Sequence, residues 1–247
     1  MSKKKGKNSN YKNSSTVNTK AEDKKKNRII TVVCLSIVGA LVLGALGFSL
    51  FASGNGKTEK MGTGACAYLE TRDVSGREIS YVEFTIQDHG KFVVLVDATT
   101  APQTAANFLG LVRDGFYDGL TIFRAQDKFV IQGGKDESVK LWPIAGEFSS
   151  NGHANDISHI RGVISMARTN DPNSATSQFF ITLHDDAKRS LDGEYAAFGY
   201  VVQGMSVVDE VAKTLINSPS SGYMGFVGDE DAITIVKAKI LEGYTPD

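Results

Sequence analysis

Two short runs, Phe129-Val-Ile-Gln-Gly-Gly134 and Ser177-Gln-Phe-Phe-Ile181, are rich in residues that favour β-strands, and each contains one glutamine. A buried side-chain amide without a partner costs about 1–3 kcal/mol, so stability alone rarely selects glutamine in a buried strand. We therefore expect a wall of aromatic rings from which the two amides project into a cleft. Such a cleft suits a small apolar group attached to a peptide bond, for example proline.

The segments around these runs predict more strands and two helices. Tyr81–Ile86 and Lys91–Val96 flank Asp88-His89-Gly90, a pattern typical of a β-hairpin. Short strand candidates recur along the chain, and the last runs from Ile233 to Leu241. Many β elements with two separated helices indicate a mainly β domain, a closed barrel capped at its ends.

The first predicted helix begins near Thr100, whose hydroxyl can cap it, and has Pro102 in its first turn. Gly115 ends this helix, and the second helix opens at Ser206. The apolar residues of each helix recur at the spacing of one helix face. Those expected to point inward are Ala105, Phe108, Leu109 and Val112 in the first helix and Val207, Val208 and Val211 in the second.

Charge is distributed unevenly along the 247 residues, although the net charge is only −1. Residues 1–28 are rich in lysine and poor in apolar side chains, so we expect a disordered basic tail. The residues after position 52 carry more acidic than basic side chains. An acidic main domain argues against nucleic acid as a partner, because phosphate binding needs a basic surface.

The uncharged run Ile29–Ala52 predicts a transmembrane helix. At 1.5 Å per residue it spans about 36 Å, enough to cross a hydrocarbon core of about 30 Å with some tilt. Lysines flank only its N-terminal side, so the positive-inside rule places residues 1–28 in the cytoplasm and the main domain outside the cell membrane. A cleaved signal peptide is the alternative, but the long run and the lack of a suitable cleavage site argue against it. Residues 53–76 are interpreted as a linker.

The cysteines and histidines predict neither a disulfide nor a metal site. Cys34 lies in the apolar run and Cys66 in the linker, which leaves Cys66 as a lone thiol. The four histidines show no spacing typical of metal ligands, and His184-Asp185-Asp186 is better interpreted as a polar loop.

Eight motifs in the chain, taken together and in order, resemble the cyclophilin-type peptidyl-prolyl cis-trans isomerases. The motifs are Pro102-x-Thr104-x-x-Asn107-Phe108, Gly115-Phe-Tyr-Asp-Gly119, Phe129-x-x-Gln-Gly-Gly134, Gly146-Glu-Phe148, Gly162-Val-Ile-Ser-Met-Ala167, Ser177-Gln-Phe-Phe180, Leu191-Asp-Gly193 and Phe198-Gly199. The resemblance covers about residues 77–245, which form the predicted isomerase domain. It implies an eight-stranded antiparallel β-barrel with a helix over each open end. It also implies an active groove on the outer face of the barrel and no cofactor.

The same resemblance implies a set of site residues. The catalytic residues are Arg124, Gln132 and Phe129, with Gln132 holding the substrate carbonyl and orienting Arg124. The residues assigned to substrate binding are Val130, Phe180, Leu191 and Tyr195, which complete the proline pocket with Phe129, and Ala167, Arg168, Thr169 and Gln178, which form a shallow wall for the residue before proline. An ion pair of Arg124 with Asp127 on the surface, and plain core packing of Phe129 and Phe180, are the structural alternatives.

The chemistry of proline isomerisation explains the choice of arginine. Rotation about an X–Pro bond crosses a barrier of about 18–20 kcal/mol and takes tens to hundreds of seconds without a catalyst. No covalent step is needed. A donor aimed at the prolyl nitrogen helps, because that nitrogen gains lone-pair character only as the bond twists. Arginine suits this task because it stays charged and presents several N–H groups.

The chain departs from the family pattern at several positions near the implied site. Phe123 stands where the family usually has histidine, Val130 replaces a common methionine, and Tyr195 replaces a histidine. Ser190 stands where many members carry a tryptophan or another aromatic residue. In the best-known members that tryptophan contacts cyclosporin, so we expect weak cyclosporin binding here.

These observations predict a membrane-anchored, extracytoplasmic prolyl isomerase that assists the folding of exported polypeptides. We expect the isomerase domain to be monomeric. The alternative is a proline-peptide binding module or holdase-type chaperone with little turnover. The short segment Lys135–Ala145, which lacks the usual Gly-Thr-Gly-Gly loop, and Ser190 motivate this alternative. Trp142 in that segment is expected to pack against the barrel. A serine or metal hydrolase lacks both a nucleophile motif and ligand spacing.

Overall fold

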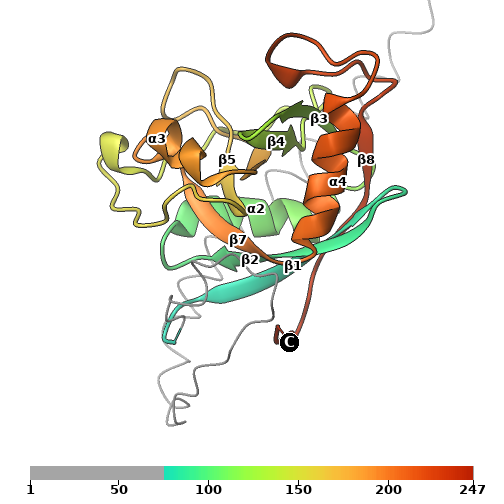
Figure 1. Ribbon diagram of the computed structural model, residues 1–247. Coiled ribbons are helices and arrows are strands. Elements are labelled where there is room, and N and C mark those ends of the chain that lie inside the picture. Colours follow the sequence, from blue (N-terminus) through green and yellow to red (C-terminus); the bar gives the residue numbers. More distant parts are fainter. Residues whose placement is uncertain (1–74, 247) are drawn as a thin grey trace, which may run out of the picture. The chain divides into compact units, whose positions relative to one another are not determined.

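The structure, a computed structural model, describes residues 75–246 (Figure 1). The predicted tail 1–28, the predicted transmembrane run 29–52 and nearly all of the predicted linker 53–76 lie outside the described residues. Within the part of the chain that the structure describes, no helix is long and apolar enough to cross a membrane. The membrane anchor therefore stays a prediction.

Residues 75–246 form eight strands, three α-helices and three short 3-10 turns. In chain order these are β1 (Ile79–Ile86), β2 (Gly90–Asp97), α2 (Pro102–Arg113), β3 (Thr121–Gln126), β4 (Val130–Gly133), η1 (Ser149–Asn151), β5 (Val163–Met166), β6 (Phe179–Thr182), η2 (Asp185–Ala187), α3 (Lys188–Leu191), β7 (Ala197–Gln203), α4 (Met205–Ile216), η3 (Tyr223–Gly225) and β8 (Ile233–Ile240). The predicted hairpin is confirmed in β1 and β2, and the last strand ends one residue earlier than predicted. The helix α3 and the three 3-10 turns were not predicted.

The eight strands close into one antiparallel barrel in the order β1-β2-β7-β5-β6-β4-β3-β8. Closure occurs because β8 pairs with both β1 and β3. This arrangement confirms the predicted mainly β fold and its eight-stranded antiparallel barrel.

The barrel interior holds the main hydrophobic core, and both predicted helices contribute to it. Along β1 every second residue points inward, namely Val82, Phe84 and Ile86. Phe108 of α2 and Val211 of α4 belong to the same interior cluster. The interior of a closed barrel can be reached only through its ends. Because both helices contribute to the interior cluster, they lie over the open ends of the barrel. Figure 1 shows α2 and α4 packed against the strands.

The predicted cap of the first helix is wrong. The Thr100 hydroxyl donates a hydrogen bond to the buried Asp97 carboxylate, 3.1 Å away, and makes no cap. The free N–H groups at the helix start, those of Gln103 and Thr104, donate to the carboxylate of Glu147 at 3.0 and 2.8 Å. Asp97 competes for the hydroxyl, and a buried glutamate from another part of the chain supplies the acceptors that the first turn needs.

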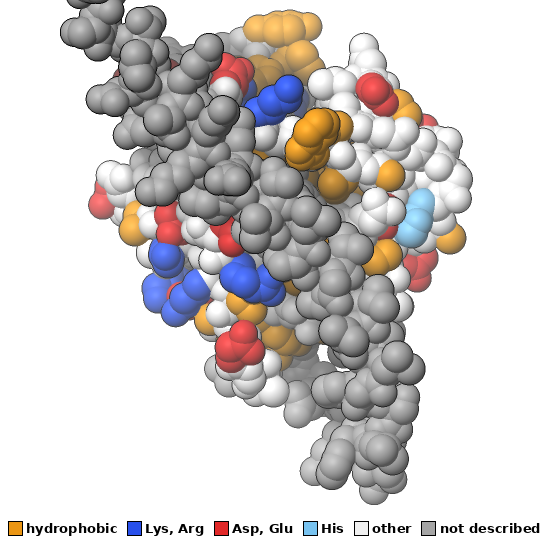
Figure 2. All heavy atoms as spheres, turned by 180° about the vertical axis from the view of Figure 1, so that it is seen from behind, with side chains coloured by type: hydrophobic (Ala, Val, Ile, Leu, Met, Phe, Trp, Pro, Cys, Tyr) orange, Lys and Arg blue, Asp and Glu red, His pale blue; other side chains and the backbone are white. Residues whose placement is uncertain are grey.

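The surface of the domain carries mixed charges. On the face shown in Figure 2, acidic and basic side chains lie next to one another, and apolar side chains occur in small separate groups. Glu83, for example, pairs with Lys91 at 3.1 Å and with Lys239 at 3.2 Å.

Candidate active site

The strand register places the predicted catalytic residues in one row on the outer face of the barrel. Arg124 of β3 is paired with Gln132 of β4, and Gln132 is paired with Phe180 of β6. Directly paired residues of antiparallel strands point to the same side of the sheet. Their neighbours along the strands, such as Ile131 and Ile181, belong to the interior cluster, so the row faces outward. Arg124, Gln132 and Phe180 therefore lie on the outer face of the barrel, where the family resemblance places the active groove.

Arg124 is half-buried and held by three hydrogen bonds. Its Nε donates to the backbone oxygen of Met224 at 2.9 Å, its Nη1 to Oε1 of Gln132 at 2.9 Å and its Nη2 to Oε1 of Gln126 at 3.0 Å. Burial lowers the pKa of the Arg124 guanidinium, but arginine remains charged in proteins. These neutral oxygen acceptors, rather than the Asp127 carboxylate, are the partners of Arg124 among residues 75–246, so the predicted alternative of an ion pair is wrong.

The hydrogen-bond geometry leaves donor groups on Arg124 for a ligand. A guanidinium has five N–H groups, and three of them are used by the bonds described above. Each terminal nitrogen therefore keeps one N–H that has no hydrogen-bond partner among the described residues.

Gln132 connects Arg124 to Gln178. The Gln132 oxygen accepts from Arg124, and its Nε2 donates to Oε1 of Gln178 at 3.0 Å. Both glutamines are half-buried, and the amide of Gln132 retains a second N–H. The two runs that began the sequence argument thus bring their amides together beside the guanidinium. The two amides are therefore paired, as expected, and the cleft into which they should project stays a prediction.

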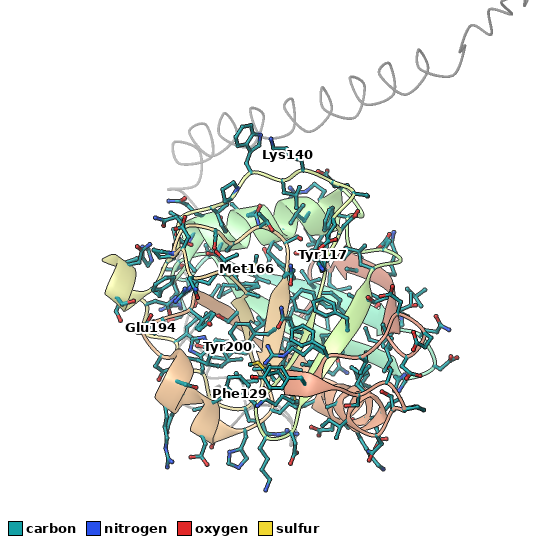
Figure 3. All side chains as sticks on the ribbon, turned by 90° about the horizontal axis from the view of Figure 1, so that it is seen from above. Tyr117, Phe129, Lys140, Met166, Glu194 and Tyr200 are labelled. Carbon is teal, nitrogen blue, oxygen red and sulfur yellow. The ribbon has the colours of Figure 1, made fainter. Side chains whose placement is uncertain are left out.

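The five residues predicted to form the proline pocket lie in one small cluster outside the barrel core. Its members are Val130, Phe180 and Leu191, which are buried, and Phe129, Ala167 and Tyr195, which are half-buried and pack against them, together with the unpredicted Ala187. The ring of Tyr195 meets that of Phe180 edge-on at 5.5 Å. Phe129 is marked in Figure 3 at the side of the domain opposite Lys140. Phe129 and Phe180 lie outside the main core, in this second apolar cluster, where Phe180 is buried and Phe129 is half-buried. The alternative that they serve packing stays open.

A hydrogen-bonded group that the sequence argument missed supports Phe180 from behind. The ring of His159 stacks on Phe180 at 5.9 Å. Its Nδ1 lies 2.9 Å from Asp192 and its Nε2 lies 3.0 Å from Ser165. Because a carboxylate only accepts, Nδ1 donates to Asp192 and Nε2 faces the hydroxyl.

The hydrogen bonds connect serine, histidine and aspartate as in the catalytic triad of a hydrolase. Unlike a catalytic serine, however, this serine cannot be reached by a substrate. Ser165 and His159 are buried, and Ser165 pairs with Phe180 in the sheet. A nucleophile must reach its substrate, and this hydroxyl does not. Partial burial would raise the pKa of Asp192, but hydrogen bonds from His159 and from the Ser158 hydroxyl outweigh it and lower the pKa to about 2. The group is therefore a support for the aromatic cluster.

The residues predicted to contact the residue before proline lie next to this cluster. The guanidinium of Arg168 lies over the ring of Tyr195 at 4.7 Å, and its Nε donates to the backbone oxygen of Glu194 at 2.9 Å. The N–H of Ala167 donates to the backbone oxygen of Gln178 at 2.9 Å. Thr169 is exposed and bonded to the Ser174 hydroxyl at the start of a turn. Arg168 is thus bound to Tyr195 and Glu194. Ala167 is bonded to Gln178, whose side chain in turn accepts from Gln132.

Two of the departures from the family pattern have a clear structural outcome. Ser190 is exposed, and its hydroxyl donates to the backbone oxygen of Ala187 at 3.2 Å. Trp142 does not pack against the barrel as predicted, because it is 72% exposed and is accompanied by the ammonium of Lys140 at 5.9 Å. Figure 3 places Lys140 far from Phe129, so the Trp142 side of the domain is not next to the aromatic cluster.

The sequence argument also missed the loop between α4 and β8. This loop carries η3 and supplies Met224, whose backbone oxygen holds Arg124, and Phe226, whose ring lies 5.1 Å from the guanidinium carbon. The only signal in the sequence was the apolar composition of Tyr223-Met-Gly-Phe-Val227 between polar residues. Among residues 75–246, no three Asp, Glu, His or Cys side chains gather as a metal site.

An eight-stranded barrel with a guanidinium, two glutamines and an aromatic cluster on its outer face is the architecture of a cyclophilin domain. Comparisons with known proteins agree. Residues 81–238 match the family model described as cyclophilin type peptidyl-prolyl cis-trans isomerase. The chain therefore belongs to the cyclophilin-type peptidyl-prolyl cis-trans isomerases and is an isomerase of this type.

Curated relatives support this assignment. A Streptomyces antibioticus protein named peptidyl-prolyl cis-trans isomerase cyp18 is 38% identical over 163 residues, which cover 62% of this chain and 93% of the relative. Peptidyl-prolyl cis-trans isomerase B of Escherichia coli is 36% identical, with 59% and 92% covered. An Acinetobacter baylyi peptidyl-prolyl cis-trans isomerase is 44% identical over 50% of this chain and 65% of its own length.

Solved structures share the fold. A cyclophilin type peptidyl-prolyl cis-trans isomerase of Cryptosporidium parvum superposes with a TM-score of 0.56 at 23% identity, covering 68% of this chain and all of that chain. A structure of the same protein in the presence of the dipeptide Ala-Pro gives a TM-score of 0.54 at 24% identity, covering 66% of this chain and 99% of that chain.

Proposed function

We propose that the chain isomerises X–Pro bonds in exported or cell-surface polypeptides, and that Arg124 stabilises the twisted amide. The observation that carries the mechanism is the half-buried guanidinium held by neutral oxygens, with one N–H on each terminal nitrogen that no residue in 75–246 engages. As the bond twists, the prolyl nitrogen becomes pyramidal and accepts a hydrogen bond that the planar amide cannot accept. A donor fixed in advance at that position stabilises the transition state more than the ground state.

The neighbouring groups position the substrate in this proposal. The proline ring occupies the surface formed by Phe129, Val130 and Phe180 with Leu191 and Tyr195. The second N–H of the Gln132 amide holds the substrate carbonyl, while its oxygen keeps the guanidinium in place. Ala167, Thr169 and Gln178 contact the residue before proline. Proton transfer and covalent bonding play no part, because only rotation is catalysed.

The experiment compares Arg124→Ala with the wild-type full-length chain in mild detergent. Loss of a single preorganised donor costs about 2.7–4 kcal/mol, so kcat should fall roughly 10²- to 10³-fold. The measurement is the cis–trans exchange rate of a short X–Pro peptide by NMR. Arg113→Ala is the matched control, because Arg113 is exposed in the last turn of α2. If wild type and Arg124→Ala bind the peptide and both leave its exchange rate at the uncatalysed value, the domain is instead a proline-peptide binding module.

We place the isomerase domain on the outer side of the cell membrane in this proposal. The uncharged run Ile29–Ala52 and the lysines that precede it support a single-pass anchor with a cytoplasmic N-terminus. Unfolded polypeptides contain about 10–30% cis X–Pro bonds and can stall on their isomerisation, so a site of protein export would benefit from this activity. Protease added to intact cells should digest the domain. Protection of the domain until the cells are lysed would contradict this orientation.

Cyclosporin is expected to bind weakly. The expectation depends on Ser190, which is exposed and offers only a small polar side chain where other members present a large aromatic surface.

A further inference from the structure

The loop between α4 and β8 presents a group of exposed apolar side chains beside Arg124. Tyr223 is 89% exposed, Met224 is 49% exposed and Phe226 is 45% exposed. Only two other large apolar side chains in residues 75–246 are similarly exposed. Isolated exposed apolar residues are common, but three within four positions at the edge of a site indicate a binding surface. We call Tyr223, Met224 and Phe226 the apolar patch.

The apolar patch is fixed to the catalytic strand rather than loosely attached. The N–H of Val227 donates to the backbone oxygen of Phe123 at 3.0 Å, and Arg124 and Phe226 form an isolated β-bridge. The rings of Phe226 and Phe123 stack at 6.1 Å with an angle of 15° between their planes. The guanidinium of Arg124 lies over the other partner of this stack, Phe226. These contacts connect the patch directly to the strand that carries Arg124.

The base of the loop is also closed by its own hydrogen bonds. The hydroxyl of Ser220 donates to the Asp231 carboxylate at 2.6 Å and accepts from the N–H of Gly228 at 2.8 Å. The N–H of Gly222 donates to the backbone oxygen of Phe226 at 2.8 Å. These bonds fix the shape of the loop that carries the patch.

The strand order determines which substrate residue reaches the patch. Across the site the sequence of elements is η3, β3 with Arg124, β4 with Gln132, and β6 with Phe180. Ala167 and Gln178, proposed for the residue before proline, lie at the β6 end of this row. The apolar patch lies at the other end, beyond Arg124. With its prolyl nitrogen at Arg124 and the preceding residue at Ala167 and Gln178, as proposed above, a peptide would have its following residues on the side of the patch.

We propose that the apolar patch is a specificity subsite for an apolar side chain on the C-terminal side of proline. This inference rests on the proposed role of Arg124. The patch is partly open to water, so its preference is smaller than that of an enclosed pocket. We expect kcat/KM to be roughly fivefold higher for an X-Pro-Leu peptide than for the matched X-Pro-Asn peptide. Because the contact is remote from the twisting bond, the difference should lie in KM rather than in kcat.

The test measures both peptides by exchange NMR over a range of peptide concentrations, with full-length wild type and the double variant Tyr223→Ala, Met224→Ala. Truncation of these side chains leaves the backbone oxygen that holds Arg124 in the chain. The leucine preference should fall to about one in the double variant through a higher KM for the leucine peptide. Val236→Ala is the matched control, because Val236 is also 49% exposed but lies on β8, and it should keep the preference.

The outcomes separate the subsite from the proposed mechanism. Equal kcat/KM for both peptides with active wild type would overturn the subsite and leave the role of Arg124 intact. A leucine preference that survives in the double variant would place the selectivity elsewhere and also overturn the subsite. If wild type isomerises neither peptide, the proposed function fails. Chemical-shift titration of the same two peptides against both proteins then decides the subsite by affinity.

Discussion

Replacing Gln132 by leucine tests how the guanidinium is oriented. Gln132→Leu keeps the approximate size of the side chain but removes the oxygen that accepts from Arg124 at 2.9 Å and the N–H that donates to Gln178 at 3.0 Å. A hydrogen bond to a charged group contributes about 1.5–3 kcal/mol. Arg124 keeps its bonds to Gln126 and to the backbone oxygen of Met224. The loss should therefore be smaller than that caused by removing the guanidinium.

We expect kcat of Gln132→Leu to fall about 10- to 100-fold, which corresponds to roughly 1.4–2.7 kcal/mol. The assay is NMR exchange at saturating X–Pro peptide. The free energy of unfolding in urea should change by only about 1 kcal/mol, because Gln132 is half-buried and the amide left on Gln178 can reach water. Gln87→Leu is the control, because Gln87 is exposed in the β1–β2 hairpin. An unchanged kcat would refute the orienting role of Gln132.

The double variant of Arg124→Ala with Gln132→Leu sharpens this test. If Gln132 acts mainly through the guanidinium, the double variant should be about as slow as Arg124→Ala alone, because there is nothing left to orient. Losses that simply add would show that Gln132 acts independently, through the substrate carbonyl.

Three further changes have expected outcomes. Ser190→Trp should raise cyclosporin affinity at least about tenfold, measured by calorimetry, because it restores a large apolar surface at an exposed position. The pKa of Asp192, lowered from 3.8 to about 2 in the folded state, means that its bonds to His159 stabilise the fold above pH 4 and are lost as pH falls toward 2. Urea unfolding of Asp192→Asn should therefore depend less on pH in this window than wild type does. Gly225→Ala should shift the loop, because the new Cβ would lie 2.0 Å from the Ala125 oxygen and the φ of +79° is strained for alanine. We therefore expect kcat to fall about tenfold in the exchange assay while the circular dichroism spectrum stays unchanged.

The sequence was informative wherever local pattern and family motif agreed. The alternation in Tyr81–Ile86 and the turn residues after it predict the hairpin, because period-2 burial and a tight turn are local properties. The glutamines at 132 and 178 were predicted to share a cleft, because an amide in an apolar strand needs a partner. The family motif then placed Arg124 beside them, and the strand register confirms that placement.

The contacts that the sequence did not predict join residues that are far apart in the chain. The residue types involved do not indicate these contacts. Met224 holds Arg124 through a backbone oxygen one hundred positions away, and any residue type could supply that oxygen. Glu147 binds the start of α2 from more than forty positions away and replaces the local cap expected of Thr100. Local propensity describes neither contact, because both depend on how the barrel brings loops together.

Phe123, next to Arg124 in β3, has an aromatic partner in this same loop. Phenylalanine has no N–H to donate, so Phe123 can act on the site only through packing. It stacks on Phe226, and such an aromatic pair contributes about 0.5–1.5 kcal/mol beyond simple burial. Phe226 in turn lies under the guanidinium of Arg124, whose Nε is held by the neighbouring Met224 oxygen. The stack of Phe123 on Phe226 therefore holds the loop against β3 beside Arg124. Disturbing this pair should therefore change the orientation of Arg124 more than it changes the stability of the barrel.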